Sequence, residues 1–196
     1  MSVNIFSDTA VSLSEHFSEI DGVIIGGSGE FSFSEKNISP DLFKNIKKSV
    51  PFIKRSVKKN IPILGICLGH QLLGYVFGSK IINSQRTFGT FPVQLTPAGK
   101  KDPLFNGIPE RFLAQQGHQD SIQRLPKGAV LLAESDNCKI EAFKIKNKNV
   151  YGVQFHPELG KKSSEERLLM TNLDRSIKFK KSPYTKKIIS NFLDLK

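Results

Sequence analysis

The most informative stretch of this sequence is Ile61-Pro-Ile-Leu-Gly-Ile-Cys-Leu-Gly-His-Gln-Leu-Leu-Gly-Tyr-Val-Phe-Gly78. It begins with a short apolar run and continues, after Cys67, with apolar residues at the three- and four-residue spacing of one helix face. Gly78 stands where such a helix would end. The pattern therefore predicts a strand, a sharp turn at Cys67 and an amphipathic helix.

Two features of Cys67 suit a nucleophile. Gly65 and Gly69 flank it two residues away on either side, which permits a tight, strained strand-to-helix turn of the nucleophile-elbow kind. A sulfur at this turn lies at a helix N-terminus, where free N–H groups and the helix dipole stabilise a thiolate and can bind an oxyanion. For Cys67 taken by itself, a buried and inert cysteine is the alternative.

A second motif, Tyr151-Gly-Val-Gln-Phe-His-Pro-Glu158, supplies the groups that such a nucleophile needs. Its alternating apolar residues predict a strand that ends at His156, because Pro157 cannot continue it. Glu158 is close enough to hydrogen-bond one nitrogen of His156 while the other nitrogen faces a thiol. A cysteine nucleophile needs a base, and the base needs an orienting group. The sequence therefore predicts a catalytic triad of Cys67, His156 and Glu158.

The motifs Gly65-Ile-Cys-Leu-Gly-His-Gln71 and Gly152-Val-Gln-Phe-His-Pro-Glu158 resemble those of the class I (triad) glutamine amidotransferase family. The resemblance extends from about Asp21 to the C-terminus and is strongest to stand-alone domains similar to the glutaminase part of GMP synthase. It implies hydrolysis of the side-chain amide of L-glutamine through a γ-glutamyl thioester, with the ammonia delivered to a separate ATP-dependent synthetase partner. Two alternatives remain: a γ-glutamyl peptidase or hydrolase with the same triad, and a catalytically silent regulatory subunit.

The resemblance also implies an oxyanion hole. The segment Asp21-Gly-Val-Ile-Ile-Gly-Gly-Ser-Gly-Glu30 is typical of a buried strand followed by a glycine loop, and such loops can bind anions through backbone N–H groups. By resemblance, the N–H groups of Gly27 and Leu68 hold the oxyanion, and Gly29 approaches the substrate. A plain turn between strand and helix is the alternative for this loop.

Further substrate contacts are expected from a polar segment, Gln115-Gln-Gly-His-Gln-Asp-Ser121, which we expect at a strand end. By resemblance, backbone groups of Gln119 and Asp120 contact the substrate amino acid. The side chain of Gln71 can donate and accept hydrogen bonds, which suits substrate recognition. His118 is a second candidate base, but His156 is preferred because only His156 has a carboxylate at Pro-Glu spacing.

Metal and cofactor chemistry is not expected. Cys67, His70, His118 and His156 show no close ligand spacing, so the sequence predicts no metal site. The triad needs no cofactor. Cys138 is expected to be unreactive.

The composition predicts a single domain spanning residues 1–196. With 38% hydrophobic residues and two cysteines, the sequence is typical of a globular domain without a disulfide framework. No uncharged apolar segment is long enough to span a membrane and no signal peptide is recognisable, so a cytoplasmic location is expected. The formal charge is +11, but the lysines are not interleaved with base-stacking aromatic residues, so nucleic-acid binding is not expected. A solvated basic surface is the simplest interpretation, and an acidic partner or anionic ligand is the alternative.

The order of predicted elements indicates an α/β fold of the flavodoxin-like class I amidotransferase type. Strands and helices alternate up to Gly78, as in an open, mainly parallel central sheet flanked by helices, with the helical stretch Ser39–Asn60 interrupted at Pro51. Short β-like runs after Gly78 predict an added antiparallel hairpin layer. A short strand is expected at Val3–Phe6. The usual first strand and helix of the family are expected to be missing.

Overall fold

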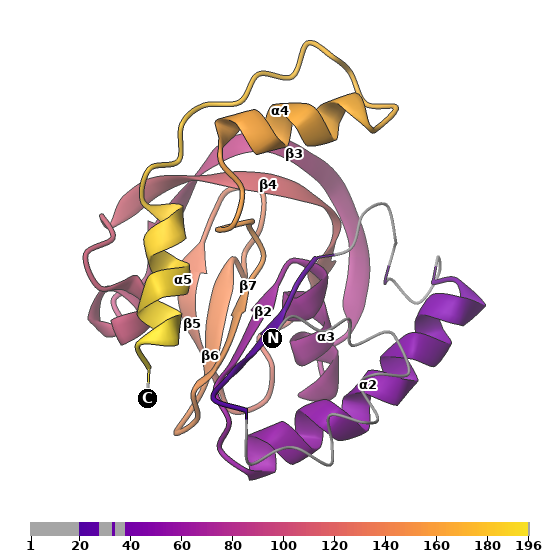
Figure 1. Cartoon of the computed structure of the whole chain (residues 1–196), viewed down its shortest axis with the longest axis vertical. Helices are drawn as coiled ribbons and strands as arrows, with labels where there is room; N and C mark the ends of the chain where they lie inside the picture. The colour runs from indigo at the N-terminus through magenta and orange to yellow at the C-terminus, as the bar shows by residue number, and fades with distance from the viewer. Residues whose placement is uncertain (1–19, 28–32, 34–37, 196) are drawn as a thin grey trace.

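The computed structural model describes residues 20–27, 33 and 38–195 of the chain (Figure 1). Its strands are β1 (Val23–Ile25), β2 (Ile63–Ile66), β3 (Ile81–Leu95), β4 (Arg111–Ile122), β5 (Ala129–Glu134), β6 (Ala142–Ile145) and β7 (Val150–Val153). Its α-helices are α2 (Pro40–Lys58), α3 (Leu68–Val76), α4 (Lys161–Leu169) and α5 (Thr185–Leu193), and short 3-10 turns lie at Gly99–Lys101 and Pro103–Phe105. None of the helices in the described ranges combines the length and apolarity needed to cross a membrane. The strand expected at Val3–Phe6, and the expectation of a missing first strand and helix, lie outside the described residues.

The described strands form one seven-stranded sheet in the order β1-β2-β7-β6-β5-β3-β4. Its first three strands are parallel, with Gly65 paired to Ile25 on one side and to Gly152 on the other. The remaining neighbours are antiparallel. The predicted α/β class is confirmed, but parallel pairing is confined to β1, β2 and β7. Short turns link β5, β6 and β7 in sequence, and a short turn can join only antiparallel neighbours.

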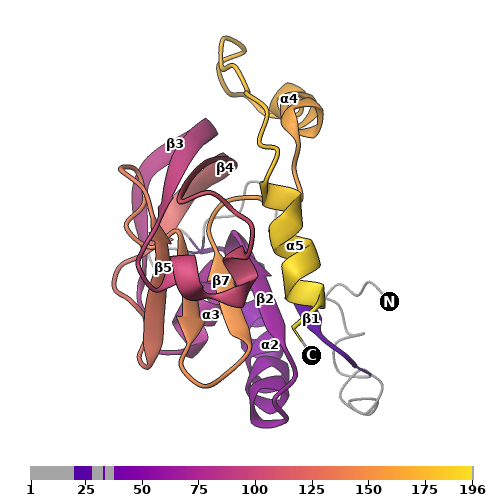
Figure 2. The same cartoon turned by 90° about the vertical axis from the view of Figure 1, so that its left-hand side faces the viewer.

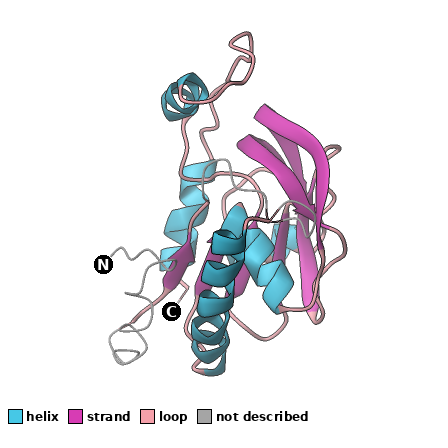
Figure 3. Ribbon diagram, turned by 90° about the vertical axis from the view of Figure 1, so that its right-hand side faces the viewer, coloured by secondary structure: helices cyan, strands magenta, loops and turns pink. Residues whose placement is uncertain are grey.

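Helices cover both faces of the sheet (Figures 2 and 3). On one face, α2 and α3 bury Ile46, Ile53 and Leu72 completely. On the opposite face, α5 contributes Ile188 and Phe192 to a second core cluster. Figure 2 shows β3 and β4 curling away from the central strands.

Helix α2 differs from its prediction. Pro51 was expected to interrupt the helix, but α2 runs through it without a break. The buried side chains of Ile46 and Ile53 hold both halves of the helix against the sheet, so packing outweighs the backbone hydrogen bond that proline cannot donate. Phe43 is 37% exposed and lies beneath the ammonium group of Lys47, at 4.3 Å.

Strand β4 is longer than the sequence predicted. The polar segment 115–121 does not lie at a strand end but forms the second half of β4, paired with β3 through Phe88 opposite Gly117 and Thr87 opposite His118. The pairing register shifts between Asn83 and Thr87. Because β3 supplies a partner for its backbone groups, this polar stretch can remain a strand.

Candidate active site

The ends of three neighbouring strands bring the predicted site together. Gly27 follows β1, Cys67 follows β2 and His156 follows β7. Since these strands are parallel neighbours, their carboxyl ends meet at one edge of the sheet. A Cβ atom placed on Gly27 would lie 2.9 Å from Cε1 of His156 and 3.3 Å from Cβ of Cys67. These three residues are therefore in direct contact.

Cys67 lies on the sharp turn predicted between β2 and α3. Its backbone has φ 52° and ψ −104°, a conformation that a residue with a side chain adopts only under strain. A Cβ atom on Gly65 would lie 2.5 Å from the carbonyl of Gly69, and one on Gly69 would lie 2.1 Å from the carbonyl oxygen of Ile25. Only glycine fits at these two positions, because the backbones of β1, β2 and α3 approach each other so closely.

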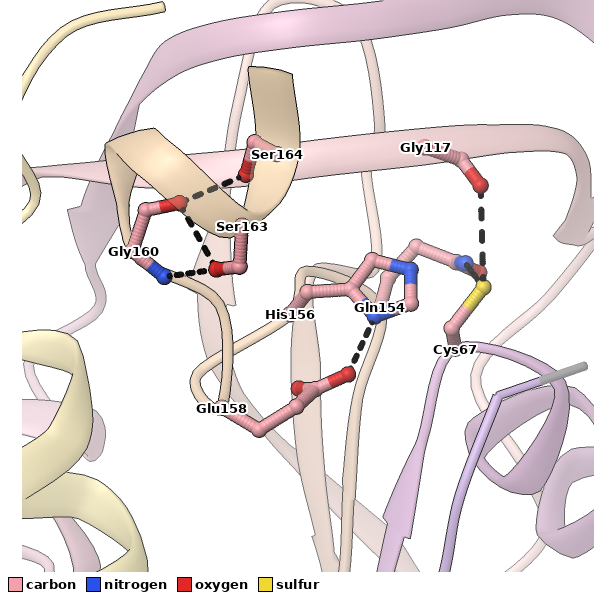
Figure 4. A network of polar contacts seen from close by, with 8 residues as sticks. All are labelled: Cys67, Gly117, Gln154, His156, Glu158, Gly160, Ser163 and Ser164. Atoms are coloured by element: carbon pink, nitrogen blue, oxygen red, sulfur yellow. Dashed lines mark hydrogen bonds and ion pairs between the residues drawn. The ribbon is translucent and has the colours of Figure 1, made fainter. Parts of the chain in front are cut away.

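The thiol of Cys67 is almost enclosed, since the residue is only 8% exposed. Its Sγ lies 3.9 Å from the carbonyl oxygen of Gly117 and 3.7 Å from Nε2 of Gln154 (Figure 4). Helix α3 begins at the next residue, so the N–H groups of its first turn point toward the sulfur end of the site. A negative charge on Sγ is therefore close to a side-chain donor and to a helix N-terminus.

His156 lies between the Glu158 carboxylate and Cys67 (Figure 4). Its Nδ1 is 2.6 Å from Oε1 of Glu158, and its backbone N–H donates to the carbonyl of Gln115 at 2.8 Å. Nε2 is buried and has no hydrogen-bond partner among the described residues. It is therefore available to a substrate.

The charge state of His156 follows from these neighbours. Burial by itself lowers the pKa of the imidazole, but the negative charge of a nearby Cys67 thiolate and the hydrogen bond to Glu158 outweigh it and raise the pKa to about 10. The arrangement therefore favours a protonated imidazole next to Cys67 at neutral pH, and a cationic base of this kind is what a cysteine nucleophile requires.

The backbone N–H groups of Gly27 and Leu68 were predicted to form the oxyanion hole. Neither donates to a backbone acceptor within the described part of the chain. Leu68 is the first residue of α3, and Gly27 contacts Cys67 from the neighbouring strand end. Both residues thus lie next to Cys67, and their role in an oxyanion hole stays a prediction.

The predicted substrate contacts are only partly available in this structure. Nε2 of Gln71 donates to the carbonyl of Asp120 at 2.8 Å, so that donor is already bound within the protein. The Asp120 carboxylate accepts the N–H of Phe33 and the amide of Asn83. The carbonyl of Gln119 accepts the Ser84 hydroxyl at 2.8 Å. Gly29 lies outside the described residues.

The other two described histidines do not contact a carboxylate of the site. Nδ1 of His118 lies 3.2 Å from the carbonyl of Asp120, and burial lowers the pKa of this histidine to about 4. His70 is completely buried against Phe143, and burial lowers its pKa to about 3. Both side chains are therefore neutral near pH 7. Within the described ranges, no three His, Cys, Asp or Glu side chains are grouped so that they could hold a metal ion.

Three contacts at the site were not predicted from the sequence: those of Gln154 and Gly117 with the thiol, and a buried pair formed by Gln116 and Glu141. The signal for Gln154 was present in the sequence, because a residue two positions before His156 points to the same side of an extended segment. The other contacts depend on cross-strand register, which the sequence did not specify. Cys138 is buried, and burial together with Glu141 raises the pKa of its thiol to about 12.

The comparison with known protein families agrees with this geometry. Residues 2–175 match the family model of the class-I glutamine amidotransferases. The chain therefore belongs to the class I glutamine amidotransferase family, and the predicted family is confirmed.

Within this family, the chain is similar to GMP synthases. It is 35% identical over 141 residues to a glutamine-hydrolysing GMP synthase subunit of Methanocaldococcus jannaschii, covering 72% of this chain and 66% of that protein. It is 36% identical over 146 residues to the glutamine-hydrolysing GMP synthase of Thermosipho melanesiensis, of which it spans only 28%. A glutamine amidotransferase of Thermotoga maritima has the same fold, with a TM-score of 0.64 and 25% identity over 89% of this chain and 66% of that one.

Proposed function

We propose that this protein hydrolyses the side-chain amide of L-glutamine to glutamate and ammonia. The observation that carries the proposal is the geometry of the triad. Cys67 has a strained backbone and a buried thiol, and it lies beside His156, whose Nδ1 is 2.6 Å from Oε1 of Glu158. The match to the class I glutamine amidotransferases supports the choice of glutamine as substrate.

In the first half of the reaction, the Cys67 thiolate attacks the amide carbon of glutamine. The N–H groups of Gly27 and Leu68 receive the negative charge that develops on the amide oxygen, and each such donor is worth about 3 kcal/mol in the transition state. His156 then gives the proton on Nε2 to the departing nitrogen, so that ammonia leaves and a γ-glutamyl thioester remains.

In the second half, water replaces ammonia beside His156. The imidazole, now neutral, removes a proton from the water as it attacks the thioester, and glutamate is released with regeneration of the thiolate. Glu158 holds Nδ1 throughout, which keeps Nε2 directed at the reacting atoms. Gly29, Gln71, Gln119 and Asp120 are proposed to bind the α-amino and α-carboxylate groups of the substrate, with Gln71 exchanging its internal hydrogen bond for one to the substrate.

The ammonia is proposed to pass to a separate ATP-dependent synthetase. The Methanocaldococcus and Thermosipho relatives named above are GMP synthases or subunits of one, which supports a nucleotide synthetase as the partner class. The cytoplasmic location expected from the sequence stays a prediction.

The test is an assay of the purified chain for glutamate and ammonia release from L-glutamine, with and without a GMP synthetase subunit. We expect Cys67→Ala to abolish release and a glutamine analogue carrying an electrophilic carbon in place of the amide to add covalently at Cys67. Cys138→Ala is the matched control, because its thiol is buried with a pKa of about 12 and should not react. If the wild type shows no turnover with or without the partner and takes up no label, the protein is a silent subunit.

One observation favours γ-glutamyl compounds as second substrates. A pocket beside His156 is lined by Gly117, Phe88, Phe179 and Arg167 of α4. An amino acid attached to the γ-amide nitrogen could place its carboxylate near the Arg167 guanidinium. Release of the free amino acid from a γ-glutamyl dipeptide, compared with ammonia release from glutamine by the same preparation, separates the two activities.

A further inference from the structure

A buried carboxyl group, Glu141, lies behind the nucleophile and takes no part in the mechanism above. Its side chain has no exposed surface, in the segment that leads into β6. Its Oε1 accepts two hydrogen bonds of 2.7 Å, one from Nε2 of Gln116 on β4 and one from the hydroxyl of Ser135. The pair of Gln116 and Glu141 therefore links β4 to the strands beneath the site.

The same two side chains leave two acceptors without donors. Neither Oε2 of Glu141 nor Oε1 of Gln116 has a hydrogen-bond partner in the part of the chain that the structure describes, and both atoms are buried. Buried acceptors without a donor are costly. A single proton on Oε2 of Glu141, donated to Oε1 of Gln116, would satisfy both atoms and complete a two-bonded pair of a carboxylic acid and an amide.

The surroundings of Glu141 favour the protonated form. Among the described residues, the groups that face it are Ser135 and Gln116, which donate to it, and the thiol of Cys138, which its charge affects. None of these groups carries a positive charge. Burial raises the pKa of Glu141 to about 7, although the hydrogen bonds from Ser135 and Gln116 act in the opposite direction.

The strand that carries Gln116 contacts both reacting residues, Cys67 through its thiol and His156 through its backbone N–H. The carbonyl of Gln115 accepts the backbone N–H of His156 at 2.8 Å, and the carbonyl of Gly117 lies 3.9 Å from Sγ of Cys67. Gln116 lies between these two contacts. A side chain that fixes Gln116 therefore fixes the segment of β4 against which the thiol and the imidazole are aligned.

We infer that Glu141 is a positioning residue for the active site, which as a neutral carboxylic acid forms a double hydrogen bond with Gln116 and so holds the Gln115–Gly117 segment of β4 against Cys67 and His156. The kinetic part of this inference depends on the function proposed above, whereas the protonation part does not. As the pH rises through about 7, Glu141 loses its proton, the second hydrogen bond breaks and the segment loosens. Its effect on catalysis is therefore greatest below this pH.

The protonation state is tested without any assay of activity. We expect an infrared difference spectrum of the wild type minus Glu141→Gln, recorded near pH 6, to contain the C=O stretching band of a protonated carboxylic acid. The matched control is Glu134→Gln, which removes a carboxyl group at the exposed end of β5 instead of a buried one. A difference spectrum for Glu141 that contains only carboxylate bands would overturn the inference.

The positioning role is tested by the pH dependence of kcat for glutamine hydrolysis. Glu141→Gln retains a donor for Oε1 of Gln116, so we expect its kcat at pH 6 to be near that of the wild type. Because this donor does not ionise, the variant should lack the loss of kcat above pH 7 that ionisation of Glu141 causes in the wild type. Glu141→Leu leaves Gln116 without either bond and should lower kcat about tenfold or more with a smaller change in KM. If the leucine variant does not fold, Ser135→Ala takes its place: it removes a hydrogen bond that lowers the pKa of Glu141, so the alkaline loss of kcat should move to higher pH, and an unmoved pH profile would contradict the inference.

A kcat for Glu141→Gln that is as low as for Glu141→Leu, or a wild-type alkaline loss that persists in Glu141→Gln, would contradict the positioning role. If the wild type itself releases no ammonia, the proposed function fails, and the infrared result still decides whether Glu141 is protonated. Failure of the inference and failure of the proposed function are therefore distinguishable.

Discussion

Cys67 has a strained backbone, and the strain is held by close contacts around it. The two glycines on either side let β1, β2 and α3 approach within distances that no Cβ atom would permit. Gly27 also permits close packing, because the absence of a side chain there leaves room for both His156 and Cys67. The position of Cys67 thus depends on the absence of side chains at the neighbouring glycines as much as on hydrogen bonds.

Replacing Gly27 by alanine should therefore damage catalysis more than folding. The added Cβ would press on Cε1 of His156 at 2.9 Å and displace the imidazole, so we expect kcat for glutamine to fall by about 100-fold. Gly26→Ala is the matched control, because no atom of the described residues lies within 4 Å of its Cβ position. Steady-state kinetics of both variants, with circular dichroism to check the fold, provide the measurement. Equal losses for the two variants would contradict the argument.

The charge of His156 should depend on Cys67. Its pKa is raised from the ordinary value of 6.5 to about 10, so the stability contributed by the protonated imidazole is fully present below pH 6.5 and is lost as the pH rises through 10. Nitrogen NMR of the imidazole should show titration well above pH 7 in the wild type and a lower pKa in Cys67→Ala. An unchanged His156 pKa in that variant would show that the thiolate is not its main partner.

The residues of the triad could be predicted from the sequence, but the buried polar contacts next to the triad could not. Cys67 could be proposed from its flanking glycines, and His156 with Glu158 from their spacing, because each signal is local. Gln116 lies on β4 and Glu141 directly precedes β6, so their pairing depends on where these two strands lie in the sheet, and no local sequence signal gives that order. A pair of this kind can be identified only when the order and register of the strands are known.

At the scale of elements, local signals predicted α3 and β1 correctly and misjudged α2 and β4. Glycine and apolar periodicity set the ends of α3, since its last turn is followed by Gly78 with φ +87°. Pro51 is a strong local break signal, yet tertiary packing overrides it in α2. The second half of β4 can be a strand although it is polar, because its backbone groups pair with β3.

Removing the proline should strengthen α2. Pro51 is exposed within the helix, so Pro51→Ala restores a backbone donor without disturbing the core, and we expect a gain of about 1–3 kcal/mol in the free energy of unfolding. Lys54→Ala, also exposed on α2, should change this free energy by less than about 0.5 kcal/mol. Urea denaturation of the two variants makes the comparison. A destabilised Pro51→Ala protein would mean that the proline sets a bend which the packing of α2 requires.

For the molecule as a whole, the two faces of the sheet are covered unequally. Helices α2 and α3 pack on one face, whereas on the other face α5 contributes Ile188 and Phe192 to the second core cluster, to which α4 contributes no described side chain. Its Ile188 is completely buried, and Phe192 is 2% exposed. The stability of the second core should therefore depend strongly on this short helix near the C-terminus.

Truncating Ile188 to alanine should lower the free energy of unfolding by about 2–4 kcal/mol, because it opens a cavity in the second core. Leu193→Ala in the same helix removes a side chain that is 60% exposed and should cost less than about 0.5 kcal/mol. The two variants are compared by chemical denaturation at neutral pH. Similar losses for both would indicate that α5 is not anchored through its buried face.

The position of β7 also bears on synthesis of the protein. This strand comes last in sequence among the described strands but lies between β2 and β6, and the imidazole that faces Cys67 follows it directly. A ribosome must therefore release almost the whole domain before the thiol can meet its base. We expect unfinished chains to be inert toward glutamine, so that the growing polypeptide releases no ammonia before its fold is closed.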